Sequence, residues 1–451
     1  MVAVFLFILG IYCYEIKQDR VNFYLILQFL ALSGYSMLLW DAEIVRMDDL
    51  ALLMVLYSFL RKGIYQKNSS TLTSMVYAYL AVISMSALVS FLYYQIPAMQ
   101  IFKGARAALY ILVFFDLKGM TGKEYENLFF KIFLLSSLAS LLYCSQVLTG
   151  VNLTIEVRGP GFLGLPRSFN YPPLIAFNCL YAALVLDRKY KWFAPLLVLS
   201  FMTLFVIQSR GMIMSVLLAV FAGISLRANK SNRILISILA LGFFVVLISN
   251  LIFSGEAGDN TLNDFSKIAS GEFASDDFEH ETNATFTYRL NLLAICIIKT
   301  FSDPVRFFFG SGLLIEMPYS FFERWDMVES CFFAVDDYTY YTPDISFSNI
   351  IYNIGFFGAI VYTSLVIVML KTLMKWADGD NTLEIVGAML TLYMLLIALD
   401  SSILTWPNTL VVPFLFAQYV SIRHKKEPVL KLLILLFLLK SRILMKQNKV
   451  N

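Results

Sequence analysis

The sequence has few charged residues and almost no histidine. Of its 451 residues, 15% are charged, 2 are histidine and 59% are hydrophobic, and the mean hydropathy is +0.71. A soluble domain carries about a quarter charged residues, so this composition excludes a set of water-soluble domains and indicates a polytopic membrane protein. The two histidines, His280 and His424, lie far apart in the chain, which argues against histidine-based metal catalysis.

The sequence also lacks a cysteine framework and a cleavable leader. Its five cysteines include no CxxC pair, so the pattern predicts neither a disulfide scaffold nor a zinc site. The opening "MVAVFLFILGIYCYE" has no basic first segment and no small-residue cleavage site. We therefore expect it to be a first membrane span rather than a signal peptide.

Long apolar runs fill most of the chain. A span needs about 20 apolar residues, and the runs predict an all-α polytopic protein with about 12–14 transmembrane helices. The predicted spans are 2–14, 21–40, 47–60, 71–94, 97–116, 129–149, 172–186, 192–208, 211–227, 234–253, 345–370, 384–400 and 403–422. The apolar tail after these spans fits a last span or an interfacial amphipathic helix equally well.

The connections between spans alternate in charge along the whole chain. Every second connection is basic, and those between are acidic, neutral or sparsely charged. By the positive-inside rule the basic set faces the cytoplasm, so the longest connection faces outward. We expect four regions: a helix bundle (1–253), an outward-facing loop subdomain with an amphipathic helix (254–343), C-terminal spans (344–422) and a basic tail (423–451).

An arginine interrupts the longest apolar run. The run from Phe193 to Leu226 covers 34 residues, too many for one span, and splitting it at Gln208–Gly211 gives two ordinary spans. Ser209 then caps the second helix and Gly211 permits a tight turn. Arg210 lies at the outer tip of this hairpin, where it can hold an anion such as phosphate. The alternative is an interfacial arginine that reaches to lipid headgroups.

Two further outer segments offer arginines for phosphate recognition. The loop "EVRGPGFLGLPRSFNYPPLIAFN" contains Arg158, Arg167 and Asn170, and arginine suits bidentate contacts to phosphate. Arg289 lies in the amphipathic segment "TYRLNLLA" of the long loop. An ordinary surface loop and a solvated helix face are the respective alternatives.

The remaining candidates are one carboxylate and one pair of cations. Asp344 is the last carboxylate before a span and is suited to act as a general base, to cap the helix, or to do both. Lys103 and Arg106 share one helical face near the outer end of the span 97–116. They are either substrate ligands or snorkelling side chains.

Four local patterns, in order, resemble those of the bacterial O-antigen polymerase and O-antigen ligase superfamily, the Wzy-type membrane glycosyltransferases. They are "RGPGFLGLPRSFNYPPLIAFN", "QSRGMIMSVLLAV", "TYRLNLLAICIIKTFSDPVRFFFGSGL" and "DISFSNIIYNIGFFGAIVY". The resemblance covers about residues 125–375, whereas the first 120 residues match only as generic spans. It implies a GT-C-like fold in which periplasmic arginines bind the diphosphate of an undecaprenyl-linked donor.

The resemblance assigns this role to Arg210 and Arg289, supported by Arg158 or Arg167. The ligases carry a histidine where the span after the long loop begins, and this sequence has Asp344 there. We therefore expect a polymerase that joins undecaprenyl-diphosphate-linked repeat units without metal or cofactor. Its expected partners are the lipid-linked donor and acceptor, membrane lipids, a chain-length regulator and a flippase, but no nucleic acid. An O-antigen ligase, a lipid-linked oligosaccharide flippase and a non-enzymatic scaffold are the alternatives.

Overall fold

The computed structural model describes residues 2–36, 47–61, 70–154, 158–160, 166–168, 171–186, 191–228, 293, 297–298, 300–313, 332–335, 338–341, 346–377, 381–398 and 409–424. Every predicted span except 234–253, which lies outside these ranges, contains a helix. The helices are α1 (Val2–Glu15), α2 (Arg20–Ala31), α3 (Met47–Arg61), α4 (Thr71–Leu92), α5 (Ala98–Leu109), α6 (Val113–Asp116), α7 (Gly122–Thr149), α8 (Ile175–Leu184), α9 (Phe193–Val206), α10 (Arg210–Arg227), α14 (Pro304–Phe309), α16 (Ser346–Met374), α17 (Thr382–Ile397) and an unlabelled last helix over residues 411–424.

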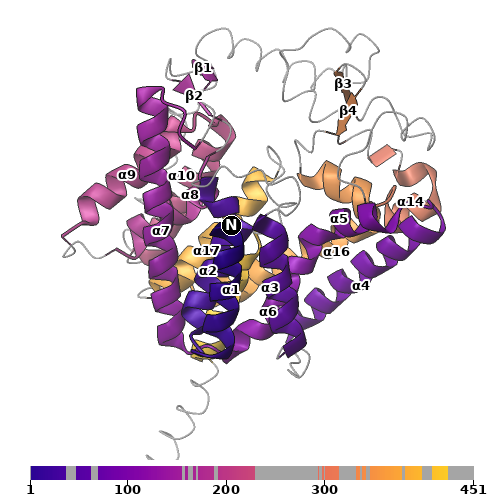
Figure 1. Ribbon diagram of the computed structural model, residues 1–451, viewed down its shortest axis with the longest axis horizontal. Coiled ribbons are helices and arrows are strands. Elements are labelled where there is room, and N and C mark those ends of the chain that lie inside the picture. The colour runs from indigo at the N-terminus through magenta and orange to yellow at the C-terminus, as the bar shows by residue number, and fades with distance from the viewer. Residues whose placement is uncertain are drawn as a thin grey trace, which may run out of the picture.

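The helices form one bundle, which confirms the predicted all-α polytopic membrane class (Figure 1). Five of the described helices are long and apolar enough to cross a membrane, and four shorter apolar helices accompany them. Large apolar side chains on the outside of the bundle, such as Phe5, Leu88 and Leu141, are about half exposed. A surface of this kind is stable only against lipid or another protein.

Two short antiparallel hairpins lie beyond one end of the bundle (Figure 1). The first pairs β1 (Arg158–Pro160) with β2 (Pro166–Arg167), and the second pairs β3 (Phe332–Val335) with β4 (Tyr338–Tyr341). Most of the predicted loop subdomain 254–343, and the tail from 425 onward, lie outside the described residues.

The two ends of the bundle are defined by α10 and α17, which run in opposite directions. Gly223, near the last residue of α10, packs against Met389 and Ile385 of α17. We call the end where α10 begins the Arg210 end and the end where α17 begins the Glu384 end. Helix α7 starts at the Glu384 end, where a Cβ added to Gly122 would lie 4.0 Å from the Tyr419 ring.

The break in α16 is the main irregularity of the fold. Gly355 has φ 77° and ψ 171°, so α16 consists of a first half, residues 346–354, and a longer second half. The span 97–116 is also less regular than predicted, because a short 3-10 turn, Tyr110–Leu112, separates α5 from α6.

Candidate functional site

The predicted hairpin around Arg210 is present in the structure. Helix α9 ends at Val206, and the Ser209 side chain accepts a hydrogen bond at 3.4 Å from the backbone N–H of Met212. Arg210 is the first residue of α10 and is half-buried. The turn is made differently from the prediction, because Gln208 has φ 56° whereas Gly211 lies inside the helix. Gln208 therefore takes the left-handed conformation that the sequence assigned to glycine.

A second hairpin is attached to this turn. The Gln208 side chain is 2% exposed, and its Nε2 donates a hydrogen bond of 2.9 Å to the carbonyl of Pro166. Pro166 precedes Arg167 in β2, and Arg167 pairs directly with Arg158 across the two-stranded sheet. The backbone therefore brings three of the predicted arginine positions to the same end of the bundle.

Helix α7 fixes the base of the β1–β2 hairpin. The Tyr143 hydroxyl donates to the carbonyl of Ser168 at 3.3 Å. On the other side, Gln146 Oε1 accepts from the backbone N–H groups of Leu153 and Thr154 at 2.9 and 2.6 Å. Gln146 is 1% exposed. Buried polar groups with several partners specify one geometry. These hydrogen bonds therefore hold the hairpin against α7 in one position.

The two other cationic candidates differ from each other. Lys103 is exposed, whereas Arg106 has a side chain only 13% exposed and forms ion pairs with Asp49 at 2.9 Å and Asp48 at 3.4 Å. The Tyr110 hydroxyl also donates to the Asp48 carbonyl. The sequence analysis missed these carboxylates. Their charge offsets that of Arg106, so these ion pairs do not favour a diphosphate-binding role for Arg106. That role, and the one expected for Lys103, stay predictions.

Several predicted site residues cannot be placed. Arg289, Asp344 and Asn170 lie outside the described residues, as do the side chains of Arg158 and Arg167. The described chain resumes two residues after Asp344, at Ser346, whose N–H donates to the carbonyl of Ala398 at 3.2 Å. Roles for these residues therefore stay predictions.

The structure neither supports nor tests metal chemistry. Among the described residues, no group of three or more His, Cys, Asp or Glu side chains is placed to hold a metal ion. The expectation of a metal-free reaction stays a prediction.

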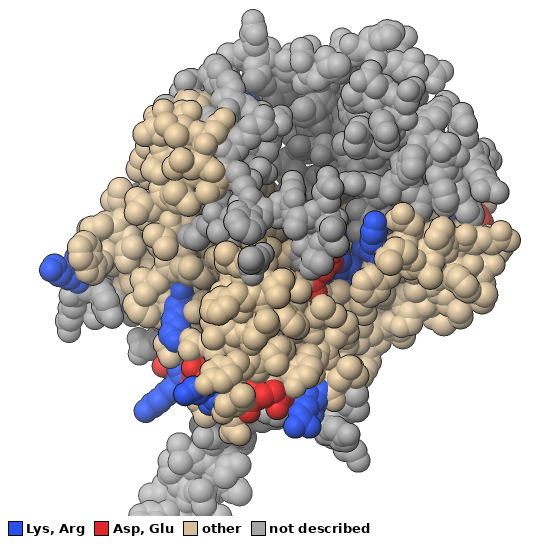
Figure 2. Space-filling view, in the orientation of Figure 1, with Lys and Arg blue, Asp and Glu red and all other residues tan. Residues whose placement is uncertain are grey.

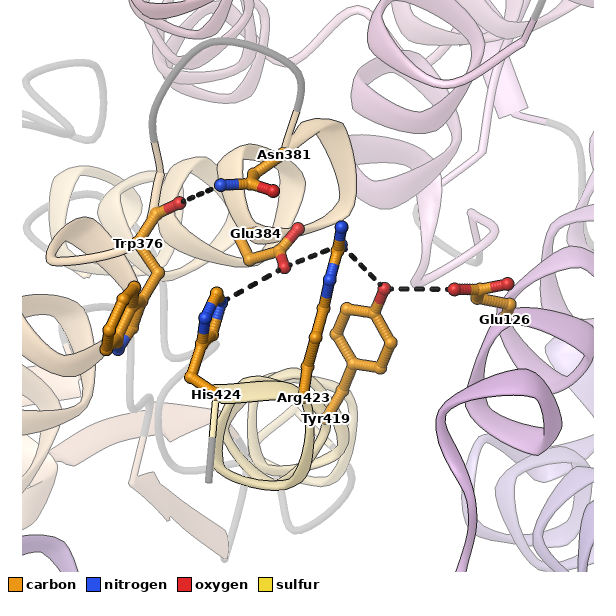
Figure 3. Close-up of polar contacts among 7 residues, drawn as sticks. All are labelled: Glu126, Trp376, Asn381, Glu384, Tyr419, Arg423 and His424. Carbon is orange, nitrogen blue, oxygen red and sulfur yellow. Dashed lines mark hydrogen bonds and ion pairs between the residues drawn. The ribbon is translucent and has the colours of Figure 1, made fainter. Parts of the chain in front are cut away.

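The Glu384 end carries a buried ion-pair cluster that the sequence analysis missed (Figure 3). Glu384 is fully buried, and its Oε1 lies 2.8 Å from Arg423 Nη1 and 3.5 Å from His424 Nε2. The His424 ring stacks on Trp376 with centroids 3.8 Å apart. The only signal in the sequence is a glutamate at a predicted span boundary, which is ordinarily solvated.

The same cluster continues to α7. Arg423 donates to the Tyr419 hydroxyl at 3.1 Å, and that hydroxyl in turn donates to Glu126 at 3.1 Å. Three elements, α7, α17 and the last helix, are therefore joined by one set of polar contacts, and the ring of Trp376, just after α16, stacks on this set. We assign this set to holding the bundle together, because the carboxylate at its centre is enclosed by protein.

The match with a known family supplies the remaining evidence. Residues 195–363 match the family model described as O-Antigen ligase. The match covers less than half of the chain and confirms the resemblance to the O-antigen polymerase and ligase superfamily that the sequence predicts. No curated protein matches the chain.

The matched segment covers α9, α10, α14 and most of α16. Arg210, Arg289 and Asp344 fall inside it. Arg158, Arg167, Asn170, Lys103 and Arg106 fall outside it, so the match says nothing about them. It does not distinguish a polymerase from a ligase, and it gives no support to a flippase.

Proposed function

We propose that the chain is a polysaccharide polymerase of the bacterial inner membrane, with its active site at the Arg210 end, facing the periplasm. It joins oligosaccharide repeat units carried on undecaprenyl diphosphate. The periplasmic orientation is supported by the basic connections, since Arg423 and Arg227 lie at the Glu384 end and basic connections face the cytoplasm.

One observation carries the proposal: the tie from Gln208 to Pro166 gathers three arginine positions at one end of the bundle. Arg158 and Arg167 are direct partners across the sheet. Like charges at directly paired positions destabilise a sheet unless something neutralises them. A diphosphate carries the charge to do so, and arginine binds it bidentately.

The proposed reaction is a single displacement. An acceptor hydroxyl oxygen bonds to the anomeric carbon of the donor, while the bond from that carbon to the diphosphate oxygen breaks. The lipid diphosphate leaves with the bonding electron pair, and Asp344 takes the hydroxyl proton. Negative charge grows on the diphosphate as the bond breaks, so arginines placed beforehand stabilise the transition state more than the ground state.

A second candidate is an O-antigen ligase, which transfers finished glycan to lipid A-core. The matching family model has the description O-Antigen ligase, but the match covers polymerases and ligases alike. The aspartate at position 344, where the ligases carry histidine, favours the polymerase.

Deleting the gene and running the cell's glycans on a gel separates these functions. Loss of a polymerase leaves core carrying one repeat unit. Loss of a ligase leaves bare core together with lipid-linked polymer, and loss of a flippase traps single lipid-linked repeats at the cytoplasmic face. A scaffold would tolerate alanine at Arg210, Arg158 and Arg167.

A further inference from the structure

The segment Asp303–Leu313, which we call the strut, packs against α16 at its break and donates a backbone hydrogen bond there. It contains α14, capped by Asp303, whose side chain accepts from the N–H of Val305 at 2.9 Å. At its end, the N–H of Ser311 donates a hydrogen bond of 2.7 Å to the carbonyl of Tyr352. The break at Gly355 interrupts the helical hydrogen bonds of the preceding turn, so this carbonyl needs an outside donor.

Two glycines make this approach possible. A Cβ on Gly310 would lie 2.5 Å from the carbonyl oxygen of Tyr352, and a Cβ on Gly355 would lie 2.6 Å from the carbonyl oxygen of Phe307. Both residues also have positive φ, 76° and 77°. Backbone therefore packs directly on backbone at this junction, and any side chain would separate the two segments.

The other side of the strut is fixed to α4 and α5. The Tyr94 hydroxyl donates to the Gly310 carbonyl at 2.9 Å, and the Leu313 N–H donates to Ser90 Oγ at 3.0 Å. Gly104 of α5 approaches the backbone of Leu313 so closely that a Cβ would lie 2.7 Å from it. Burial raises the pKa of Tyr94 to about 12, so this donor keeps its proton at any physiological pH.

The first half of α16 is consequently held at both ends by backbone hydrogen bonds to other elements. Ser346 donates to Ala398 at the end of α17, and Tyr352 accepts from the strut. Its direction is set by these contacts rather than by the second half of the helix.

We propose that Gly310, Ser311 and Gly355 are positioning residues for glycosyl transfer. They keep the strut in contact with the backbone of α16. This contact fixes the direction of the first half of α16, which begins two residues after Asp344. The strut stays seated throughout the reaction and is not a lid. This inference rests on the proposed function.

A glycine comparison tests the positioning role. Gly310→Ala and Gly355→Ala are compared with Gly150→Ala, because Gly150 has φ 70° but a Cβ added there would meet no atom within 4 Å. The control thus carries a positive φ without the contact. Its backbone strain is milder, because ψ is 12° at Gly150 but -171° at Gly310 and 171° at Gly355, a region that only glycine adopts readily. Each protein is purified into nanodiscs and given lipid-linked repeat units extracted from the deletion strain. We expect kcat to fall about 10- to 100-fold for the first two variants, with KM unchanged and with Gly150→Ala near wild type.

A second pair of variants tests the hydrogen bond from the Ser311 N–H to the Tyr352 carbonyl while leaving both glycines unchanged. Ser311→Ala keeps the backbone N–H that reaches Tyr352, and Ser311→Pro deletes it. We expect the alanine variant to match wild type and the proline variant to lose kcat. Equal activity of the two variants would overturn the assignment of Ser311.

A cross-link tests whether the strut stays seated. The variant carries Ser90→Cys with Leu313→Cys in a background with Cys296→Ser and Cys331→Ser, and once its disulfide has formed the oxidised protein should keep the kcat of the reduced protein. Loss of activity on oxidation, restored by a reductant, would show a moving lid and refute the proposal.

The outcomes separate the two proposals. If wild-type protein makes no polymer from lipid-linked repeats, the proposed function fails and this inference fails with it. If wild type makes polymer and Gly310→Ala is as active as Gly150→Ala, only the positioning role fails.

Discussion

Arg423 at the Glu384 end and the three arginine positions gathered at the Arg210 end lie in different settings. At the Glu384 end, Arg423 contacts the buried carboxylate of Glu384 at 2.8 Å and the hydroxyl of Tyr419 at 3.1 Å. At the Arg210 end, Arg158 pairs directly with Arg167, and the Gln208 side chain ties their hairpin to the turn before Arg210. The first arrangement neutralises an arginine with a buried carboxylate. The second brings three arginine positions to one end of the bundle through backbone pairing and the Gln208 hydrogen bond.

The rest of the Glu384 end follows the same pattern of pairing. Charged side chains gather along the lower rim in Figure 2, below a broad uncharged surface. Arg61 pairs with Glu15 at 3.4 Å, and Lys131 donates to Asn22 at 2.9 Å. Deeper inside, Asp116 is fully buried and accepts from the hydroxyls of Tyr14 and Tyr24. We propose that the paired charges at the Glu384 end maintain stability and that the three arginines gathered at the Arg210 end serve the reaction.

Arg210→Ala should have the largest effect. We expect long glycan chains to disappear, with kcat at least about 100-fold lower, because one donor to a developing anion is worth that much in other enzymes. Insertion and melting temperature should stay near wild type. Arg210→Lys is the matched control, since it keeps the charge but loses the bidentate geometry. Polymer of normal length from Arg210→Ala would contradict the role in the reaction that we propose for Arg210.

Arg423→Met should show the reverse behaviour. It removes a cation from the buried Glu384 carboxylate, and breaking a fully buried pair costs roughly 3–5 kcal/mol. Arg423 is itself 45% exposed, so we expect a smaller loss, about 2–3 kcal/mol. Thermal unfolding in detergent measures it, while the protein that remains folded should keep wild-type kcat. An unchanged melting temperature would contradict the stabilising role.

Gln208→Ala should reduce activity by about 3- to 10-fold, because it frees the β1–β2 hairpin from the Arg210 turn at the cost of one hydrogen bond. Gln95→Ala is the control, since Gln95 also has positive φ, 53°. The initial rate of polymer formation by both variants in nanodiscs is the measurement. Equal rates would mean that the tie between the hairpins is not needed.

Tyr14→Phe should give the smaller of the two stability effects. It removes the 2.8 Å hydrogen bond to buried Asp116 and should cost about 1–2 kcal/mol of stability. Tyr12→Phe on the same helix, at a residue 40% exposed, should cost nothing measurable. Chemical denaturation of the two variants compares them, and a similar loss in both would show that the Asp116 cluster does not stabilise this end.

The sequence predicted the parts of the fold that follow from local pattern. The 34-residue run around Arg210 is too long for one span, so its division at Ser209 followed from length and helix capping alone. The membrane class and the family resemblance were predicted on similar grounds, because composition and short motifs are local properties.

What the sequence did not predict depends on contacts between distant residues. Gln208, rather than Gly211, adopts positive φ because its side chain bonds Pro166, 42 residues away. The apolar pattern of α16 continues through Gly355, so the break became visible only with the strut beside it. The sequence pattern did not single out Glu384 and left Arg106 as a substrate ligand or a snorkelling side chain, because their partners lie 39 and 57 residues away.

The central claim is that the Arg210 end binds the lipid diphosphate during glycan polymerisation. The most direct measurement gives purified wild-type and Arg210→Ala protein, in nanodiscs, the same lipid-linked repeat units and resolves the products on a gel. The account predicts a ladder of polymer from wild type and only unreacted repeat units from the equally well-folded variant. An identical ladder from Arg210→Ala would contradict it.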